Sequence, residues 1–191
     1  MVAVNVDHEA GRARLADIVC DVVADGGLEA VSVRAVASAA GVSIGAVQHY
    51  FRTKEAMLLA AHERANAKVG ARAEAAAAAA TTPRDALRTI LLSVLPNDEP
   101  SRRDLQVFIA FETAALHSPR LAEQARRSNA ELYAAFEELF RLAGTAEPRR
   151  EAIAAVGLLG LCQPLLLADP YCSLEDAIAV VDAHLDRALP R

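Results

Sequence analysis

Helical spacing of apolar residues is the feature of this sequence that most restricts its fold. One stripe, at i, i+3, i+4, i+7 and i+8, consists of Leu15, Ile18, Val19, Val22 and Val23. The same pattern returns in Val33, Val36, Ala37 and Ala40. No segment sustains the alternation of apolar and polar residues that is typical of a strand. The sequence therefore predicts an all-α protein.

Capping residues and prolines indicate where the helices begin and end. Ser32, Ser43 and Thr53 can each cap a helix, and Gly41 permits a tight turn between two of them. The first helix is expected to end at Gly26 and Gly27, and the third to run from Ser43 through Phe51. Prolines divide the remainder into helices over 83–95, 101–117, 119–143 and 147–168, and a last helix opens at Ser173. About nine helices are expected.

An alanine-rich stretch separates the two ends of the chain. Ten of the sixteen residues from 65 to 80 are alanine, which strongly favours a helix. This helix is either a frayed surface tail or a stiff arm that joins two domains. We expect a three-helix N-terminal domain over 8–54, a connecting helix over 55–80 and a larger helical bundle over 81–191.

Charge and cysteine content restrict the surroundings of the protein. The net charge of -5 argues against a general polycation, so any surface that binds nucleic acid has to be local. Three cysteines without a CxxC pair favour reduced thiols over a disulfide or zinc site. Acids near the start are unlike a signal peptide, and the uncharged run 152–168 is short of the ~20 residues of a membrane span. We expect a cytoplasmic protein without a membrane partner.

The helix after Gly41 displays polar side chains away from its apolar support. On a helical wheel Val47 and Phe51 fall on one side, and Gly45, Ala46, Gln48 and His49 point away from it. Small residues let a backbone approach another surface closely. Glutamine can pair with adenine N6 and N7, and an apolar residue such as Ile44 can meet a thymine methyl. The pattern suits a helix that enters the major groove of DNA.

Residues around this helix could hold phosphates. Lys54 opens a helix capped by Thr53, so its ammonium group and the free N–H groups can converge on one phosphate. Tyr50 and Arg34 could add contacts on either side. No acid lies between residues 30 and 54, although residues 1–64 as a whole carry six Lys or Arg against eight Asp or Glu. Helix, glycine turn and helix also occur in proteins that never bind DNA, so spacing alone leaves both alternatives open.

The stretch "VSVRAVASAAGVSIGAVQHYFRTKEAMLLAA", residues 31–61, resembles the DNA-binding region of TetR-type transcriptional regulators. The resemblance implies a cytoplasmic, all-helical homodimer whose C-terminal domain binds a small molecule. It departs from many members at Gln48, where they carry tyrosine. The residues expected to face DNA are Arg34, Ser43, Ile44, Gly45, Ala46, Gln48, His49, Tyr50, Thr53 and Lys54.

The C-terminal stretch "GLLGLCQPLLLADPYCSLEDAIAVVDAHLDRAL" is similar to the subgroup named for the choline-responsive repressor of betaine synthesis.

The apolar run 152–168 has apolar residues on all sides, so every side has to pack against another part of the protein. It is either the core helix of a monomer or one of two helices per subunit in a four-helix dimer interface. The residues expected there are Ile153, Val156, Gly157, Gly160, Ile178, Val181 and Leu185. A twofold dimer would hold two recognition helices about 34–36 Å apart.

The sequence indicates an effector pocket less clearly than it indicates the DNA-binding helix. Aromatic residues at helical spacing are either plain core or the lining of a cavity, and Gln163 beside Pro164 could meet a polar ligand group. The candidate lining is Phe108, Phe111, Glu112, His117, Tyr133, Phe136, Cys162 and Gln163. His62 and His184 are expected on the solvated surface, and His8 in a tail that could move.

Motifs of known enzymes are absent from the sequence. It has no GxSxG, no HExxH and no glycine-rich phosphate loop, and we expect no cofactor and no metal. The predicted function is a ligand-responsive transcriptional regulator. It would be a repressor that binds a palindromic operator as a homodimer and is released by a small molecule. The alternatives are a helical ligand-binding or dimerisation protein without DNA binding, and an enzyme without a recognisable motif.

Overall fold

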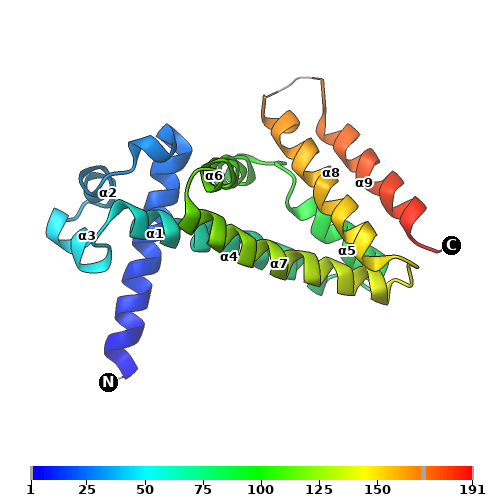
Figure 1. Ribbon diagram of the computed structural model, residues 1–191, viewed down its shortest axis with the longest axis horizontal. Helices are drawn as coiled ribbons and strands as arrows, with labels where there is room; N and C mark the ends of the chain where they lie inside the picture. Colours follow the sequence, from blue (N-terminus) through cyan, green and yellow to red (C-terminus); the bar gives the residue numbers. More distant parts are fainter. Residues whose placement is uncertain (1, 169–170, 191) are drawn as a thin grey trace. The chain divides into compact units, whose positions relative to one another are not determined.

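The computed structural model describes residues 2–168 and 171–190, with side chains from residue 8 onward. Over these residues the chain forms nine α-helices and no strand, as the sequence predicted (Figure 1). Residues 169, 170 and 191 of the predicted C-terminal bundle lie outside this description. The helices are α1 (Val2–Ala30), α2 (Val33–Ala40), α3 (Ile44–Tyr50), α4 (Lys54–Ala78), α5 (Pro83–Ser93), α6 (Glu99–Ala115), α7 (Pro119–Leu142), α8 (Pro148–Ala168) and α9 (Leu174–Ala188).

The predicted caps begin these helices. The Ser32 and Ser43 hydroxyls each accept a hydrogen bond, at 3.1 Å, from the backbone N–H three residues later. The Thr53 hydroxyl does the same at 3.0 Å. Gly41 ends α2 in the left-handed region at φ 65°. The regular geometry of α1 is broken at Gly27, where φ is 71° and ψ 179°, at the glycine pair where the sequence predicted the end of the first helix. The glycine interrupts helical geometry there, but helical turns resume as far as Ala30.

The chain divides into two compact units. The first contains the residues up to 68 together with 106–125, and the second contains 69–105 together with the residues from 126 onward. The helices α4, α6 and α7 therefore contribute residues to both units. The predicted functional boundaries near residues 54 and 80 stay a prediction.

The first unit places α2 and α3 against α1 around one core (Figure 1). Val47 and Phe51 are 0% and 1% exposed in this core, which confirms the inward face predicted for the third helix. Val107, Phe111 and Leu121 belong to the same core although they lie far along the sequence. Gln124 adds a hydrogen bond from its Nε2 to the Leu59 carbonyl, at 3.0 Å.

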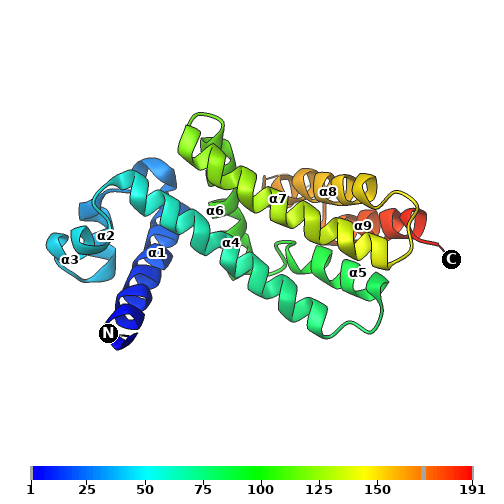
Figure 2. The same ribbon diagram turned by 60° about the horizontal axis from the view of Figure 1, so that its bottom comes forward.

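The second unit packs α9 against α5 and α8 (Figure 2). Arg88 forms two hydrogen bonds with the Asp182 carboxylate, at 2.6 and 2.9 Å, and thereby joins α5 to α9. Gln163 donates from its Nε2 to the Val94 carbonyl at 3.0 Å. Arg102 donates to the Leu166 carbonyl near the end of α8. These three side chains thus have specific partners beside the apolar core, whereas the buried Arg72 Nε and His184 Nε2 have no hydrogen-bond partner among the described residues.

Two histidines lie in these cores, which corrects the expectation that they are solvated. His62 is 2% exposed, with its ring 5.4 Å from that of Phe111 in α6. His184 is 1% exposed, and its Nε2 lies 3.9 Å from a carboxylate oxygen of Glu151. Burial lowers the pKa of both imidazoles, since the charged form loses its hydration. Both residues face other helices, which local periodicity does not reveal.

The helix α8 is, by length and composition, apolar enough to cross a membrane, and it is the one helix in the described residues that meets this criterion. One of its faces packs in the core of the second unit through Ala152, Ala155, Leu159 and Cys162. Glu151 on the same face forms an ion pair with Arg150 at 3.0 Å. One face of α8 is thus a core face, while 33% of its apolar window is buried in all.

Candidate nucleic-acid interface

The short helix α3 exposes a row of small and polar residues. Its inner side is held by Val47, by Phe51 just after it and by the Ser43 cap before it. On its outer side Gly45, Gln48 and His49 are exposed, and Ile44 is 45% exposed. An apolar side chain and two hydrogen-bonding side chains are therefore presented together, as direct contact with base edges requires.

The other residues predicted to face DNA also lie at the surface. Arg34, Ser43, Thr53 and Lys54 are exposed, and Ala46 is half-buried beside the exposed row. Tyr50 is half-buried with its ring against His8 and His49. The structure thus brings all ten predicted residues to α3 and the segments that flank it. Their contacts with DNA stay a prediction.

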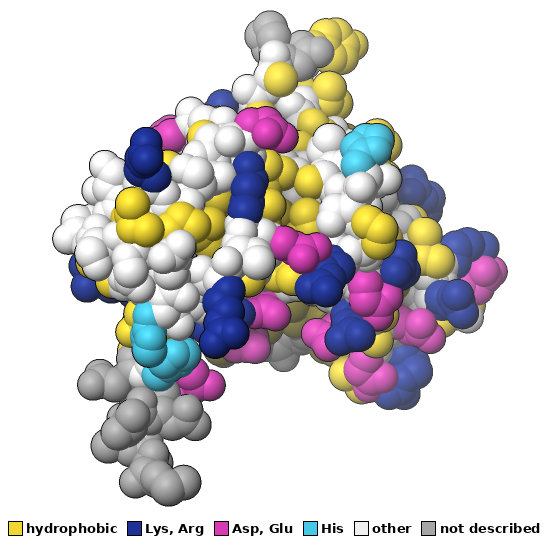
Figure 3. Space-filling view, turned by 60° about the vertical axis from the view of Figure 1, so that its left-hand side comes forward, with side chains coloured by type: hydrophobic (Ala, Val, Ile, Leu, Met, Phe, Trp, Pro, Cys, Tyr) yellow, Lys and Arg dark blue, Asp and Glu magenta, His cyan; other side chains and the backbone are white. Residues whose placement is uncertain are grey.

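The charges of the first unit are arranged unevenly. Two arginines of this unit are paired with acids: Arg12 with Glu63 at 3.5 Å and Arg120 with Glu55 at 3.3 Å. Arg34 and Arg52, by contrast, have no ion-pair partner among the residues that the structure describes. Figure 3 shows Lys and Arg side chains among uncharged side chains on one part of this surface, with Asp and Glu side chains beside them. Exposed cations without an ion-pair partner attract phosphates.

Lys54 lies where a phosphate could approach the start of α4. The Thr53 side chain caps this helix, so the first backbone N–H groups carry partial positive charge. The Lys54 Nζ lies 3.5 Å from the Glu29 carbonyl near the end of α1. Glu55 would repel a phosphate here, but its carboxylate is paired with Arg120. The start of α4 is thereby kept suitable for an anion.

The predicted effector pocket is divided between the two units. Phe108, Phe111, Glu112 and His117 belong to the first, and Tyr133, Phe136, Cys162 and Gln163 to the second. Phe111, Phe136 and Cys162 are buried in the cores, His117 is exposed, and Tyr133 is 36% exposed. Burial raises the pKa of the Cys162 thiol, which keeps it protonated and unreactive. The pocket stays a prediction.

The predicted dimer residues fall into two groups. Ile153, Gly157 and Gly160 are exposed on α8, and Val156 and Ile178 are half-buried. Val181 and Leu185 are 2% and 0% exposed, because they pack in the core of their own subunit. These two predictions are therefore corrected, since a side chain enclosed in one subunit has no surface to offer a second. Leu161, Leu165 and Val180, which the sequence prediction did not name, are also exposed on the same helices.

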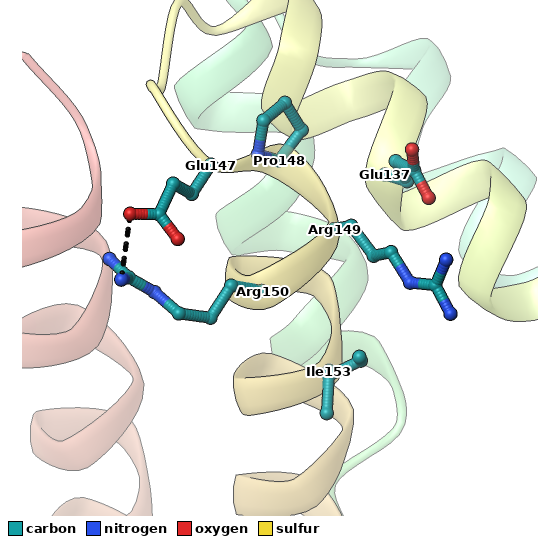
Figure 4. A pocket seen from close by; sticks show the side chains of 6 residues that line it. All are labelled: Glu137, Glu147, Pro148, Arg149, Arg150 and Ile153. Carbon is teal, nitrogen blue, oxygen red and sulfur yellow. Dashed lines mark ion pairs between the residues drawn. The ribbon is translucent and has the colours of Figure 1, made fainter.

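A shallow hollow of about 390 Å³ lies between the end of α7 and the start of α8. It is lined by Glu137, Glu147, Pro148, Arg149, Arg150 and Ile153, and none of these belongs to the predicted effector pocket. Figure 4 shows Arg150 turned towards Glu147, with which it forms an ion pair at 2.9 Å, while Arg149 extends on the other side of α8. Ile153 continues from this hollow into the exposed face of α8.

Sequence reasoning also missed two residues of α1 that touch the recognition helix. His8 was placed in a tail that could move, but it lies in α1 with its ring 5.4 Å from that of His49. Gly11 lies under the Tyr50 ring. Their spacing of three residues, which places both on one face of a helix, was the available signal.

Comparison with known proteins accounts for both ends of the chain. The family model for bacterial regulatory proteins of the tetR family matches residues 20–61. The model for the C-terminal region of BetI-type transcriptional repressors matches residues 83–190. The chain is 34% identical over 112 residues to the HTH-type transcriptional regulator PksA of Bacillus subtilis, an alignment that covers 59% of this chain and 55% of that protein.

Solved structures of other proteins are similar to this structure over nearly the whole chain. A transcriptional regulator from Rhodococcus sp. Rha1 is 32% identical, with a TM-score of 0.83, over 93% of this chain and 95% of that one. A regulator from Saccharomonospora viridis, solved in complex with choline, is 18% identical with a TM-score of 0.86, over 96% and 100%. The latter likeness shows the fold alone. The family models and these relatives describe transcriptional regulators, so the enzyme alternative is removed. The chain belongs to the tetR family of bacterial regulatory proteins, and it is a transcriptional regulator with a BetI-type C-terminal region.

Proposed function

We propose that this regulator is a cytoplasmic homodimer that represses transcription by binding a palindromic operator and leaves it when a small molecule binds. The observation that carries the proposal is the exposed row Ile44, Gly45, Gln48 and His49 above the buried Val47 and Phe51. Gln48 is the residue we assign to base recognition, with adenine as its preferred partner. Arg34, Tyr50, Thr53 and Lys54 would contact the backbone.

The proposed dimer uses the exposed faces of α8 and α9. Leu161 is 68% and Ile153 51% exposed, and two glycines lie between them on the same helix. Val180 adds an exposed apolar residue on α9. Side chains of this kind lose contact with water when a second copy packs against them, which stabilises association. The twofold symmetry of such a dimer would present two copies of α3 to successive major grooves.

The proposed effector is a small molecule bound within residues 81–191. The transcriptional regulator from Saccharomonospora viridis was solved with choline, so choline is the first compound to test here. A preference of ~1 to 3 kcal/mol for a conformation that cannot bind the operator would change its occupancy about 5- to 150-fold.

The decisive experiment is a footprint on the DNA that flanks the coding region of this protein. We expect protection of an inverted repeat whose half-sites lie about one helical turn, or a multiple of it, apart. Adding choline to the footprinted complex tests the first effector candidate. Protection of a single half-site would contradict the homodimer, and no protection of any duplex at low ionic strength would contradict DNA binding altogether.

A further inference from the structure

A histidine of α1 meets the exposed end of the recognition helix. The ring of His8 lies 5.4 Å from that of His49 and 4.9 Å from that of Tyr50, centre to centre. The rings of His49 and Tyr50 are 5.1 Å apart and nearly perpendicular, at 85°. Figure 3 shows two histidine side chains in contact at the edge of this face. We call these three rings the His8 cluster.

A glycine permits this close approach of α1 and α3. A Cβ built on Gly11 would lie 2.4 Å from the hydroxyl oxygen of Tyr50 and 2.7 Å from its Cζ, closer than real atoms approach. His8 and Gly11 are three residues apart and share one face of α1. The tyrosine ring that rests on Gly11 therefore also contacts His8, and it holds His8 next to His49.

Packing alone explains the tyrosine of the His8 cluster but not its histidines. Tyr50 is half-buried and packs against the core of the first unit. His8 and His49 are both exposed, so burial of their rings contributes little to stability. His49 lies beside Gln48 on the outer side of α3, and His8 extends the same surface onto α1. Two adjoining imidazoles are therefore open to a ligand on this surface.

The charged groups around the pair leave it able to bind an anion. On α1, Glu9 follows His8, and Arg12 is paired with Glu63 of α4 and lies 5.6 Å over the Phe51 ring. Arg52, in the turn after α3, is exposed and has no ion-pair partner in the described part of the chain. The Tyr50 ring of α3 faces both imidazoles. An aromatic face within about 6 Å favours a cation.

We propose that His8 and His49 together bind one backbone phosphate of DNA, and that they take up protons as this contact forms. Two imidazole rings at this separation can each donate an N–H to the same phosphate group, and their charged form makes the stronger hydrogen bonds. A histidine side chain changes its charge between about pH 5 and 8. This inference rests on the proposed DNA binding, and it adds α1 to the contact surface.

Proton uptake has a measurable consequence. Each proton taken up on binding raises the affinity by up to about tenfold for each unit by which the pH falls. We therefore expect the affinity to rise by about tenfold or more between pH 8 and pH 6. A phosphate contact does not depend on base sequence, so a mixed-sequence duplex of about 30 base pairs at about 50 mM salt is a sufficient probe.

The experiment compares the full-length protein with two variants of His8 by fluorescence anisotropy. His8→Gln should bind like the native protein at pH 8 and show a smaller rise in affinity at pH 6, because one of the two imidazoles proposed to contact the phosphate is removed. His8→Arg carries a permanent charge, so it should bind more tightly than the native protein at pH 8 and gain less at pH 6. Circular dichroism at both pH values verifies that each variant is folded.

A matched control lies on the same helix. Arg14 is exposed on α1 but has no contact with the His8 cluster in the described residues, and its guanidinium keeps its charge throughout this pH range. Arg14→Gln should leave the gain between pH 8 and pH 6 unchanged. An equal loss of affinity at both pH values in His8→Gln would indicate a packing role and overturn the inference.

Two other outcomes are distinguishable. If the native protein binds the duplex and His8→Gln retains the full pH-dependent gain, the inference is wrong while the proposed function stands. If the native protein binds no duplex at either pH, DNA binding fails and the inference falls with it. A reduced gain in His8→Gln, with restored affinity at pH 8 in His8→Arg, would support the phosphate contact.

Discussion

Two glycines on α8 provide a test of the proposed dimer. A Cβ built on Gly157 or Gly160 meets nothing within 4 Å inside the subunit. Glycine within a helix costs about 0.5–1 kcal/mol relative to alanine. In an isolated subunit, the double change Gly157→Ala and Gly160→Ala should therefore raise the free energy of unfolding by about 1–2 kcal/mol.

A second subunit reverses the sign of this effect. Where two helices approach closely at glycines, an added methyl group overpacks the contact at a cost of about 1–3 kcal/mol. Twofold symmetry places each substitution in the interface twice. We expect a cost of about 3 kcal/mol or more for the dimer, which raises its dissociation constant by more than about a hundredfold.

Gly70→Ala is the matched control. Gly70 lies within α4, and a Cβ there also meets nothing within 4 Å. Sedimentation equilibrium should give the native dissociation constant for this variant and a much larger one for the α8 double variant. Urea unfolding should find the subunit of each variant at least as stable as the native one. An unchanged dissociation constant in the double variant would refute the idea that these glycines face a partner.

Three further outcomes are expected. Gln48→Ala should relax the preference at one base pair in each half-site, at a cost of ~1–3 kcal/mol, and a selection experiment that returns the native motif would remove Gln48 from base recognition. Lys54→Ala should weaken binding to all duplexes alike and lower the salt dependence by about one ion, so an unchanged slope across a salt series would contradict its phosphate contact. Stability should fall as the pH is lowered from about 7 to 5, because the unfolded chain takes up protons that buried His62 and His184 resist. In His62→Leu, urea unfolding at the two pH values should show a smaller difference, and an identical difference would exclude His62 as a source.

The helices and their ends follow from the sequence itself. The side chains of Ser32, Ser43 and Thr53 each accept a hydrogen bond from the backbone N–H three residues later. The capping residue and the helix start that it stabilises therefore lie within four residues of each other in the sequence. The two sides of α3 were equally predictable, since Val47 and Phe51 are four residues apart and share one face. The fold class, the boundaries of most helices and the exposed row that carries the proposed function are therefore local properties.

Which surfaces of those helices are covered was decided only by the tertiary structure. His62 has the same spacing whether it meets solvent or Phe111, and nothing near it in the sequence indicates which. Val181 and Leu185 lie on an apolar face that a partner or their own core could cover, and their own core covers it. The contact between His8 and His49 joins residues on separate helices. Periodicity determines which residues share a face, but the element that packs against that face depends on the whole chain, because burial is a non-directional gain available from any apolar partner.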